Sequence, residues 1–567
     1  MSKSTSPPRP RPPPPSLQRW SSLYFALSAP LLAYLLLPSL SVPDLSKLAT
    51  LPSNVVGSLS QSQATCPPQV DALNVGEFWR PEDDQDYVKM ATERFQGALR
   101  IATESWDDMD IDPYKEPRYS VFDDFHRYLA EAFPTVHTSS RFDIEKVSKY
   151  GLLITFKGRE EDKKPIVLMA HQDVVPVNSA TAELWTHPPY DAVHDSEGWI
   201  WARGATDCKS TLLGILAAFE RLALEGFEPT RSLILSSGFD EEIGGHRSGP
   251  QLADALEQRY GKGGVAFIID EGISGVFSAF DQQFVTFAVA EKGFVNLKIE
   301  VHTPGGHSSV PNGVNTGIGI MSKLVTTLEE NAPQPTLQAG APLLSFLSCA
   351  AEHGTVGKVL RYLIKIPFAW SRLGQMLAKK HPLVRAFITT AQSVTVINGG
   401  IKMNALPEYV STTVNYRIDF LSSVNASISH AASLLAPIAS SFNLTFDTLG
   451  TNPELKNVKE NVVRLSITDG VEPAPISPTH GETWDFVSGT ARKVFDNAIV
   501  GPSGMIAGTD TKWTWNLTEN IYRFIPGRLD LMKNPHTVDE RIHIDAHIEA
   551  IKFYYKLAQN SQTWAAS

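Results

Sequence analysis

The sequence predicts an α/β fold that carries an inserted α+β module, and three patterns support this prediction. Short apolar runs at 166–170 and 232–236 are typical of buried strands. Between them, apolar residues recur at helical spacing over 210–225. Further along, residues 294–301 alternate between apolar and polar, which indicates a half-exposed antiparallel strand.

The order of these elements predicts how the chain is divided. Two more strand candidates at 199–202 and 265–269 make strands and helices alternate, which favours a largely parallel sheet. The antiparallel pattern returns at 410–420, and the α/β pattern resumes near residue 450. We therefore expect one domain formed by two parts of the chain, with a module inserted between them. The predicted ranges are 81–291 and 450–567 for the domain and 292–449 for the module.

The first 80 residues predict a membrane-anchored N-terminus. Residues 1–19 are basic and Pro-rich, whereas 20–43 carry no charge and have an apolar centre. About 20 apolar residues span a bilayer as a helix, and positive residues before the span favour a cytoplasmic N-terminus. Residues 44–80 then read as a flexible stalk. A cleaved signal peptide is the competing interpretation of 20–43, and a buried soluble helix is a further alternative.

An anchor of this orientation places the rest of the chain in a lumen. Three Asn-x-Ser/Thr tripeptides, at Asn425, Asn443 and Asn516, agree with that location. The three cysteines are too few for a disulfide framework, although one bridge is possible in an oxidising lumen. The sequence has no Cys-x-x-Cys pair, so a thiolate zinc site is not supported. The formal net charge of −11 argues against a nucleic-acid partner.

One basic segment has two interpretations. Residues 357–393 contain no Asp or Glu but several Lys and Arg residues among apolar ones. A basic amphipathic helical pair of this kind can contact a membrane surface. The simpler interpretation, which we favour from sequence alone, is an insertion packed on the module or at a dimer interface, because helical charge runs are usually solvated faces.

Histidine and acidic residues follow each strand candidate of the first part. Ligands bind at the carboxyl ends of strands in open α/β sheets, so these positions predict a site. Singly, each has an ordinary explanation, such as an N-cap for Asp207 or helix-start acids for Glu241 and Glu242. Together they would repel unless a divalent cation neutralised them. The residues are His171, Asp173, Asp207, Asp240, Glu241, Glu242, Asp270 and Glu271.

The residue types predict the metal. Imidazole with carboxylate and no thiolate suits zinc, and manganese or cobalt less often. Two metals about 4 Å apart require a bridging ligand, which a carboxylate can supply.

At this point the chain resembles the zinc metallopeptidase family that includes carboxypeptidase S, glutamate carboxypeptidase and aminoacylase. The resemblance runs from about residue 80 to the C-terminus and is strongest to the fungal vacuolar carboxypeptidase S branch. The motifs that carry it are AHQDVVP at 170–176, WARGATDCK at 201–209, DEEIGG at 240–245, PGGHSS at 304–309 and NPHT at 534–537. It implies a di-zinc catalytic domain and an inserted lid, or dimerisation, domain.

The resemblance also implies a role for each matching residue. His171 and Asp270 would bind the first zinc, Glu242 and His536 the second, and Asp207 both. Asp173 would orient His171 or a neighbour, and Glu241 would be the general base for an attacking water whose pKa the zinc pair lowers. A cis peptide is expected between Asp207 and Cys208. Many members have Asp or Asn where this chain has Cys208.

In the lid, His307 matches a histidine that contacts the reacting carbonyl, often in the partner subunit's site. Asn404 and Arg417 match residues that hold the substrate, and an Arg fork suits a terminal carboxylate. Alone, Arg417 would read as a surface ion pair. Gly508 and Thr509 lie in a loop that resembles the family's substrate-binding loop.

These expectations give one main function and two alternatives. The main one is a zinc carboxypeptidase that removes the C-terminal residue of small Gly-X peptides in the vacuole. A fatty-acyl amino acid hydrolase or synthase would use the same residues with an apolar acyl pocket. An inactive, receptor-like ectodomain is the third interpretation, and the complete ligand set argues against it.

Overall fold

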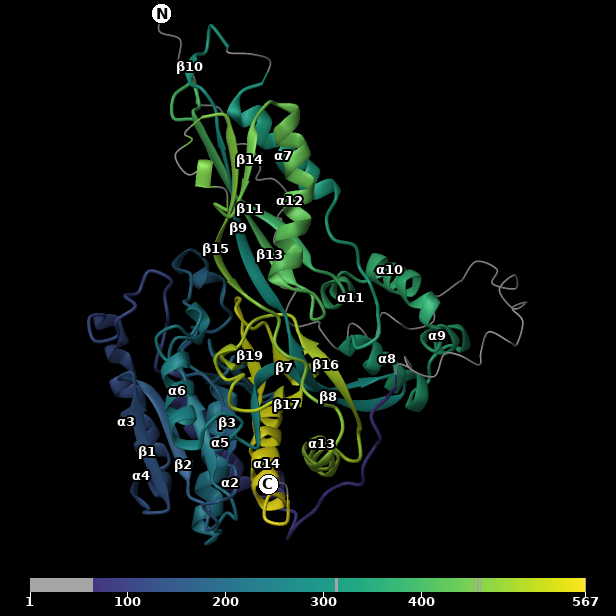
Figure 1. The fold of residues 1–567 in the computed structure, drawn as a ribbon. Coiled ribbons are helices and arrows are strands. Elements are labelled where there is room, and N and C mark those ends of the chain that lie inside the picture. Colours follow the sequence, from purple (N-terminus) through teal and green to yellow (C-terminus); the bar gives the residue numbers. More distant parts are fainter. Residues whose placement is uncertain (1–64, 312–314, 452, 456–457, 459, 566–567) are drawn as a thin grey trace, which may run out of the picture.

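The computed structural model describes residues 65–311, 315–451, 453–455, 458 and 460–565. The predicted tail, the anchor and most of the stalk lie outside these residues. None of the helices in the described part of the chain has the length and hydropathy needed to cross a membrane. Figure 1 shows a broad α/β domain with an elongated module rising from it.

An eight-stranded mixed sheet forms the centre of the α/β domain. Its spatial order is β1 (Phe142–Val147), β2 (Gly151–Phe156), β6 (Leu233–Ser237), β3 (Ile166–Met169), β7 (Phe267–Ala279), β17 (Ile521–Arg528), β8 (Gln282–Glu291) and β16 (Ile499–Met505). The four strands β6, β3, β7 and β17 run parallel, as predicted. Antiparallel pairs on either side of them make the sheet mixed.

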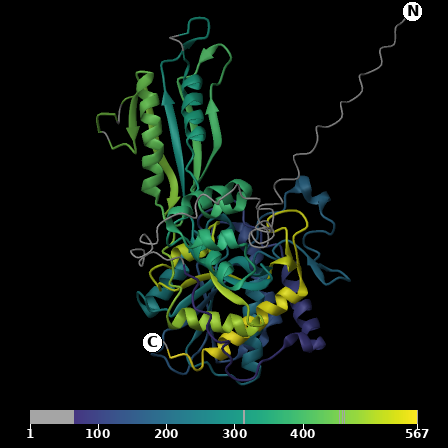
Figure 2. The same cartoon turned by 90° about the vertical axis from the view of Figure 1, so that its right-hand side faces the viewer.

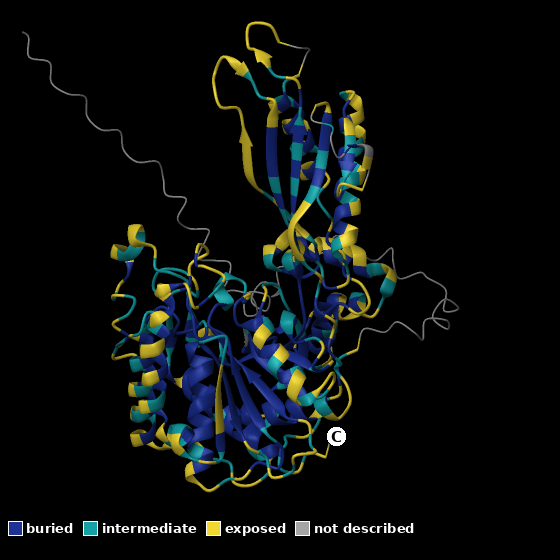
Figure 3. Cartoon of the chain, turned by 60° about the vertical axis from the view of Figure 1, so that its left-hand side comes forward, coloured by how far each residue is buried: buried dark blue, intermediate teal, exposed yellow. Residues whose placement is uncertain are grey.

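Helices cover both faces of this sheet and bury it, as the colouring in Figure 3 shows. Helix α5 is almost entirely buried, and helices α14, α4 and α2 pack against it. Gly214 of α5 lets α5 and α14 approach, since a Cβ there would lie 3.3 Å from that of Ala550. The helices of the domain are α2 (Gln85–Leu99), α3 (Val121–Ala132), α4 (Pro134–Thr138), α5 (Lys209–Leu224), α6 (Gly249–Tyr260), α13 (Glu482–Val494) and α14 (Ile544–Asn560).

The strand predicted at 199–202 exists but does not belong to the main sheet. It is β5 (Trp199–Trp201), and it lies in a small sheet of order β18 (Met532–Lys533), β19 (Arg541–His543), β5 and β4 (Val193–His194). Three residues are too few to extend through the domain, and β5 instead pairs with β19 from the far end of the chain. The expectation that all four strand candidates share one sheet edge was therefore wrong for this strand.

The inserted module, called the lid below, is built on a five-stranded sheet with helices on one face. The order is β11 (Ala391–Gly399), β13 (Tyr409–Ile418), β9 (Gly293–His302), β15 (Val462–Val471) and β14 (Thr445–Thr448). Helices α7 (Gly317–Glu330) and α12 (Val424–Ser441) pack on it. Buried and half-buried residues alternate along β9, as predicted. At the tip, β10 (Gly306–His307) pairs with β12 (Ala405–Leu406).

The second boundary of the lid lies later than the predicted 449. Strand β15 pairs with β9 over nearly its full length, so the lid sheet continues to Val471. The two segments that connect the lid to the α/β domain, one entering at Gly293 and one leaving after Val471, lie side by side. A Cβ on Gly293 would lie 2.5 Å from backbone atoms of Val471 and Pro473, so the two segments touch at a position where only glycine fits.

The segment 342–387 forms a helical insert that packs on the α/β domain rather than on the lid sheet. It contains α8 (Pro342–His353), α9 (Lys358–Ile364), α10 (Trp370–Lys380) and α11 (Pro382–Phe387). Its apolar residues share a cluster with Phe277 and Phe284 of the main sheet. A disulfide joins Cys349 of α8 to Cys66, 283 residues earlier. In Figure 2 the insert faces the viewer at the base of the lid.

Candidate metal centre

The predicted ligands converge at the carboxyl ends of the parallel strands. His171 follows β3, and Glu241 and Glu242 form a short helical turn after β6. Asp207 ends the turn that leads into α5, and His536 follows β18. The peptide between Asp207 and Cys208 is cis, as the resemblance implied.

These residues form two clusters of potential metal ligands. In the first, Nε2 of His171 lies 3.0 Å from Oδ1 of Asp207 and 3.3 Å from Oε2 of Glu271. In the second, Nε2 of His536 lies 2.9 Å from Oδ2 of Asp207 and 3.2 Å from Oε2 of Glu242. Asp207 therefore presents one carboxylate oxygen to each cluster, which is the arrangement of a bridging ligand.

The charges in the centre depend on one another. Burial alone would raise the pKa of Asp207, but hydrogen bonds with His171 and His536 hold it well below its ordinary value. Burial opposes protonation of His536, yet Asp207 and Glu242 raise its pKa to about 11. Burial raises the pKa of Glu271 to about 8. Protonated histidines thus balance the carboxylates here, and divalent cations would take over that function.

The structure corrects the expectation for Asp270. Glu271, not Asp270, directs its carboxylate to His171. Both acids lie within β7, which continues to Ala279, and successive strand residues point to opposite faces. One Asp270 oxygen accepts the N–H of Glu271, and the other is buried with no hydrogen-bond partner in the part of the chain that the structure describes.

Asp173 connects the two sides of the centre. Its backbone carbonyl lies 2.9 Å from Nδ1 of His171, and its carboxylate oxygens accept the N–H groups of Glu241 and Glu242, each at 3.1 Å. Asp173 is fully buried. It therefore fixes the ring of His171 and the turn that carries both glutamates, which is a positioning role.

Glu241 is adjacent to the ligands but belongs to neither cluster. Burial, followed by the nearby carboxylate of Glu271, raises its pKa well above the ordinary value. A carboxylate of raised basicity beside a metal pair has the properties that a general base needs.

The donor set fits divalent cations. Each cluster supplies one imidazole and two carboxylates, and the Oε1 atom of Glu242 is buried with no hydrogen-bond partner among the described residues. Such an atom is costly unless a cation or another donor reaches it. The buried Cys208 thiol lies within the first cluster as well, and its sulfur accepts the N–H of His171 at 3.2 Å.

Sequence reasoning missed one residue that builds the centre. Glu540 is fully buried and accepts hydrogen bonds from Arg203, at 2.6 Å, and from the hydroxyl and N–H of Thr206. It thereby holds the turn that ends in Asp207. The sequence signal was weak: an acid four residues after His536, more than 300 residues from its partners.

The predicted substrate loop is anchored from below. Glu291 accepts hydrogen bonds from the Thr509 hydroxyl at 2.7 Å, the Thr511 hydroxyl at 3.0 Å and Nε of Arg523 at 2.6 Å. Thr509 is fully buried, so its hydroxyl is engaged by the protein, whereas Gly508 is exposed. Glu291 is also the last residue of β8, just before the chain enters the lid. Its side chain therefore connects the substrate loop to the base of the lid.

The lid residues occupy two different places. His307 and Asn404 are exposed at the far tip, where Ser308 N–H donates to the Asn404 carbonyl at 3.1 Å. Strand β9, ten residues long, carries the chain over about 33 Å from the base of the lid towards this tip, at about 3.3 Å per residue. Arg417 lies at the base, opposite Phe294 in the sheet, with its guanidinium 5.5 Å from that ring. The structure thus separates His307 from the centre of its own chain.

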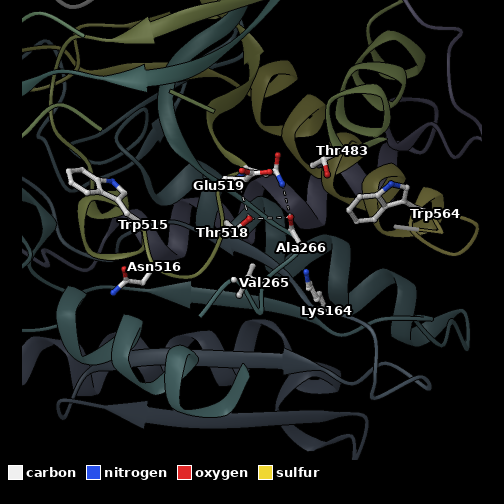
Figure 4. Close-up of a pocket in the computed structure, with 11 residues that line it drawn as sticks. Lys164, Val265, Ala266, Thr483, Trp515, Asn516, Thr518, Glu519 and Trp564 are labelled. Atoms are coloured by element: carbon white, nitrogen blue, oxygen red, sulfur yellow. Dashed lines mark hydrogen bonds between the residues drawn. The ribbon is translucent and has the colours of Figure 1, made fainter. Parts of the chain in front are cut away.

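A separate pocket of about 400 Å³ lies at the opposite ends of the same strands (Figure 4). Lys164 and Val265, which line it, precede β3 and β7, whereas the metal centre lies near the other end of β3. In the centre of the pocket, the Thr518 hydroxyl donates to the Ala266 carbonyl at 3.3 Å. This pocket is not part of the metal centre.

Comparisons with known proteins agree with this geometry. Residues 167–560 match the model of peptidase family M20/M25/M40. Carboxypeptidase S of Saccharomyces cerevisiae is 36% identical over 499 residues, which cover 85% of this chain and 86% of that protein. An N-fatty-acyl-amino acid synthase/hydrolase of Mus musculus is 31% identical over 486 residues, 83% of this chain and 88% of that protein.

A solved structure shares the fold. A dinuclear metal-binding peptidase of the same family from Bacillus subtilis has a TM-score of 0.52 and 12% identity, covering 85% of this chain and all of that one. Family match, relatives and ligand geometry together show that this chain is a metal-dependent hydrolase and belongs to peptidase family M20/M25/M40.

Proposed function

We propose that the protein is a di-zinc carboxypeptidase that removes the C-terminal residue of small peptides of the Gly-X type. The observation that carries the proposal is the pair of ligand clusters sharing Asp207, with Glu241 beside them. One imidazole and carboxylates in each cluster suit zinc. The similarity to carboxypeptidase S supports the exopeptidase reaction.

The residues of the chain then divide the chemistry between them. Bound zinc ions would polarise the scissile carbonyl and lower the pKa of water. Glu241 accepts the proton of the attacking water and returns it to the leaving amine. Asp173 holds Glu241 and His171 in place through the hydrogen bonds described above.

Recognition of a free carboxylate is assigned to the lid and the substrate loop. Arg417 is a cation at the base of the lid with an exposed side chain, and it interacts electrostatically with Glu291, the residue that anchors the 508–511 loop. A guanidinium fork binds a carboxylate through two hydrogen bonds. The exposed backbone of Gly508 would contact the substrate next to Arg417. Thr509 would fix the position of Gly508, because its hydroxyl is hydrogen-bonded to Glu291.

The position of His307 supports a homodimer formed through the lid. A histidine at the lid tip, some 33 Å along β9, can serve a site only in another subunit or after a large closure. The edge strand β11 is largely exposed and could pair with a second copy. In such a dimer, His307 and Asn404 of one subunit would contact the substrate in the other.

The cellular location follows from the N-terminus and the disulfide. A bridge between Cys66 and Cys349 is typical of proteins that fold in an oxidising compartment. Asn425, Asn443 and Asn516 are exposed, as glycan acceptors must be. We therefore assign the protein a cytoplasmic N-terminus, one membrane span at 20–43 and a lumenal catalytic domain, in the vacuole by similarity to carboxypeptidase S.

A second candidate function has its own support. The relatives that act on N-fatty-acyl-amino acids share the family and most of the length of this chain. Against it, the apolar residues of the helical insert pack on one another and on the edge of the main sheet, so they do not form an acyl pocket at the metal centre.

Turnover of two substrates separates the candidates. The protein is assayed with an N-blocked Gly-Leu dipeptide and with an N-oleoyl amino acid, each with and without a chelator. Chelator-sensitive release of leucine from the dipeptide is the expected result. Cleavage of the oleoyl compound alone would move the function to acyl amino acid hydrolysis, and failure to cleave either would refute both proposals.

A further inference from the structure

The outer face of the helical insert is strongly basic in an acidic protein. Between Glu352 and Glu408 the sequence has no acid, although the chain as a whole carries a net charge of −11. On α9, Lys358, Arg361 and Lys365 follow one another at helical spacing, and all three are exposed. On α10, Arg372 and Lys379 do the same.

These cations lack acidic partners. None of them forms an ion pair with a described acidic side chain, and Glu352, the acid of neighbouring α8, faces His353 at 3.8 Å. Arg361 donates to a backbone carbonyl, that of Gly354. Concentrated like charges without counterions attract an anionic surface, and the attraction falls off within a Debye length.

Large apolar side chains protrude among the cations. Tyr362 of α9 is 66% exposed, and Phe368, in the turn between α9 and α10, is 67% exposed. Met376, one turn after Arg372, is 41% exposed. The opposite faces of both helices already supply the buried apolar residues of the insert. The core of the insert therefore does not need these exposed side chains. Cations interspersed with exposed aromatic residues are the composition of helices that lie in a lipid headgroup layer.

The disulfide ties the insert to the first described part of the chain. Cys349 of α8 is bonded to Cys66, and the uncharged stretch at 20–43 precedes Cys66 by 22 residues of predicted stalk. The insert is therefore covalently bonded to a residue of the predicted stalk. Figure 2 shows the insert on an outer side of the molecule, at the junction of the lid and the α/β domain.

We propose that the outer face of α9 and α10 binds the surface of an anionic lipid bilayer. The cations attract lipid phosphates and carboxylates, and Phe368 and Tyr362 enter the headgroup layer. The contact would fix the orientation of the catalytic domain relative to the membrane. The sequence alone favoured an insertion packed on the module or at a dimer interface for 357–393, and the insert does pack, on the α/β domain. The proposal adds a function for the outer faces of α9 and α10, which this packing does not use.

The test measures whether Phe368 contacts lipid. The full chain carrying Phe368→Cys is labelled with an environment-sensitive fluorophore, since Cys208 is buried and the other cysteines are bonded. It is placed in phosphatidylcholine vesicles with or without phosphatidylserine and with a quencher attached to the lipid chains. Asp124→Cys is the matched control label, because Asp124 is exposed and belongs to α3, which Figure 1 shows on the opposite side of the α/β domain from the insert.

We expect quenching at position 368 in anionic vesicles, little in neutral ones and none at position 124. Reversing Lys358, Arg361, Lys365 and Arg372 to Glu should abolish the quenching. Reversing four exposed lysines elsewhere (Lys89, Lys262, Lys323 and Lys402) should leave it intact, and both variants should retain turnover.

Three results would overturn the proposal. One is equal signals in neutral and anionic vesicles, and another is quenching that survives reversal of the insert cations. The third is a shift of the fluorophore at position 368 that depends on protein concentration without vesicles, which would assign the face to a protein contact. If the N-terminal segment fails to insert, the same protein is added to preformed vesicles, so failure of the anchor does not affect the outcome.

Discussion

Oε2 of Glu271 lies 3.3 Å from Nε2 of His171, within the cluster that also contains Asp207. Asp270, its neighbour in β7, points away from His171 and accepts the N–H of Glu271. Two adjacent acids in one strand therefore have different surroundings, and we propose Glu271, not Asp270, as the ligand of the first metal.

The first prediction separates these acids. Glu271→Gln should lose about one of the two bound metals, because an amide is a weak ligand for a divalent cation. Asp270→Asn should keep both. Metal content per chain, measured by mass spectrometry of the purified variants, checks the assignment. Loss of metal in Asp270→Asn with retention in Glu271→Gln would reverse it.

The second prediction concerns the general base. Glu241→Gln should lower kcat by about 10²–10⁴-fold while both metals remain bound, because the attacking water loses its proton acceptor. Glu242→Gln is the matched control and should lose metal from the His536 cluster as well as activity. Steady-state kinetics and metal content are measured together. Normal turnover by Glu241→Gln would remove Glu241 from the mechanism.

The third prediction tests the ion pair beneath the substrate loop. Arg523→Met leaves the buried Glu291 carboxylate uncompensated, so the free energy of unfolding should fall by about 3–5 kcal/mol. The double variant with Glu291→Leu should lose less than the sum of the single ones. KM should rise in both, because Glu291 also holds Thr509.

A surface pair provides the control for that experiment. Arg259 and Glu145 form an ion pair whose side chains are 37% and 48% exposed. Arg259→Met should cost less than about 1 kcal/mol and leave KM unchanged. Denaturant unfolding followed by circular dichroism measures the loss in free energy of unfolding for Arg523→Met and for Arg259→Met. Equal losses would contradict the argument that the buried ion pair matters more than the exposed one.

The fourth prediction concerns the disulfide. Replacing Cys66 and Cys349 by Ala opens a loop of 283 residues, and removing such a constraint on the unfolded chain typically costs about 2–5 kcal/mol. The melting temperature should fall, and reduction of the unaltered protein should lower it equally. A reductant effect that persists in the Cys66→Ala, Cys349→Ala variant would point to Cys208 instead.

The sequence predicted the chemistry of the centre better than its geometry. His171, Asp207, Glu242 and His536 carry local signals, since each lies next to a strand end or in a short motif, and the structure brings them together. The expectation for Asp270 differs from the geometry because residues 265–271 are buried throughout, so no apolar/polar alternation shows which of the two acids faces the site. Strand boundaries decide which side chains point to a site.

Long-range relationships were beyond the sequence for a different reason. Glu540 acts on the turn at Arg203, 337 residues away, and the disulfide joins residues 283 apart. Neither contact leaves a local pattern. The lid boundary was misplaced for the same reason, because β15 returns to the lid sheet only through its pairing with β9.

The last prediction tests whether His307 acts in a partner subunit. His307→Ala and Glu241→Gln chains should each be nearly inactive. If the lid forms the dimer, a mixed dimer contains one site with Glu241 from one chain and His307 from the other. Random mixing makes half of the dimers mixed, and each has one complete site of two, so about a quarter of the normal activity should return.

The mixing experiment has a direct control. Mixing Glu241→Gln chains with Glu242→Gln chains should restore nothing, because each substitution disables the metal centre of its own chain and no site in a mixed dimer is complete. The two chains are unfolded and refolded together, or co-expressed, and turnover is measured against each alone. If the mixture is no more active than its components, His307 either serves its own chain after closure of the lid or takes no part in the reaction, and the tip of the lid loses its assigned role.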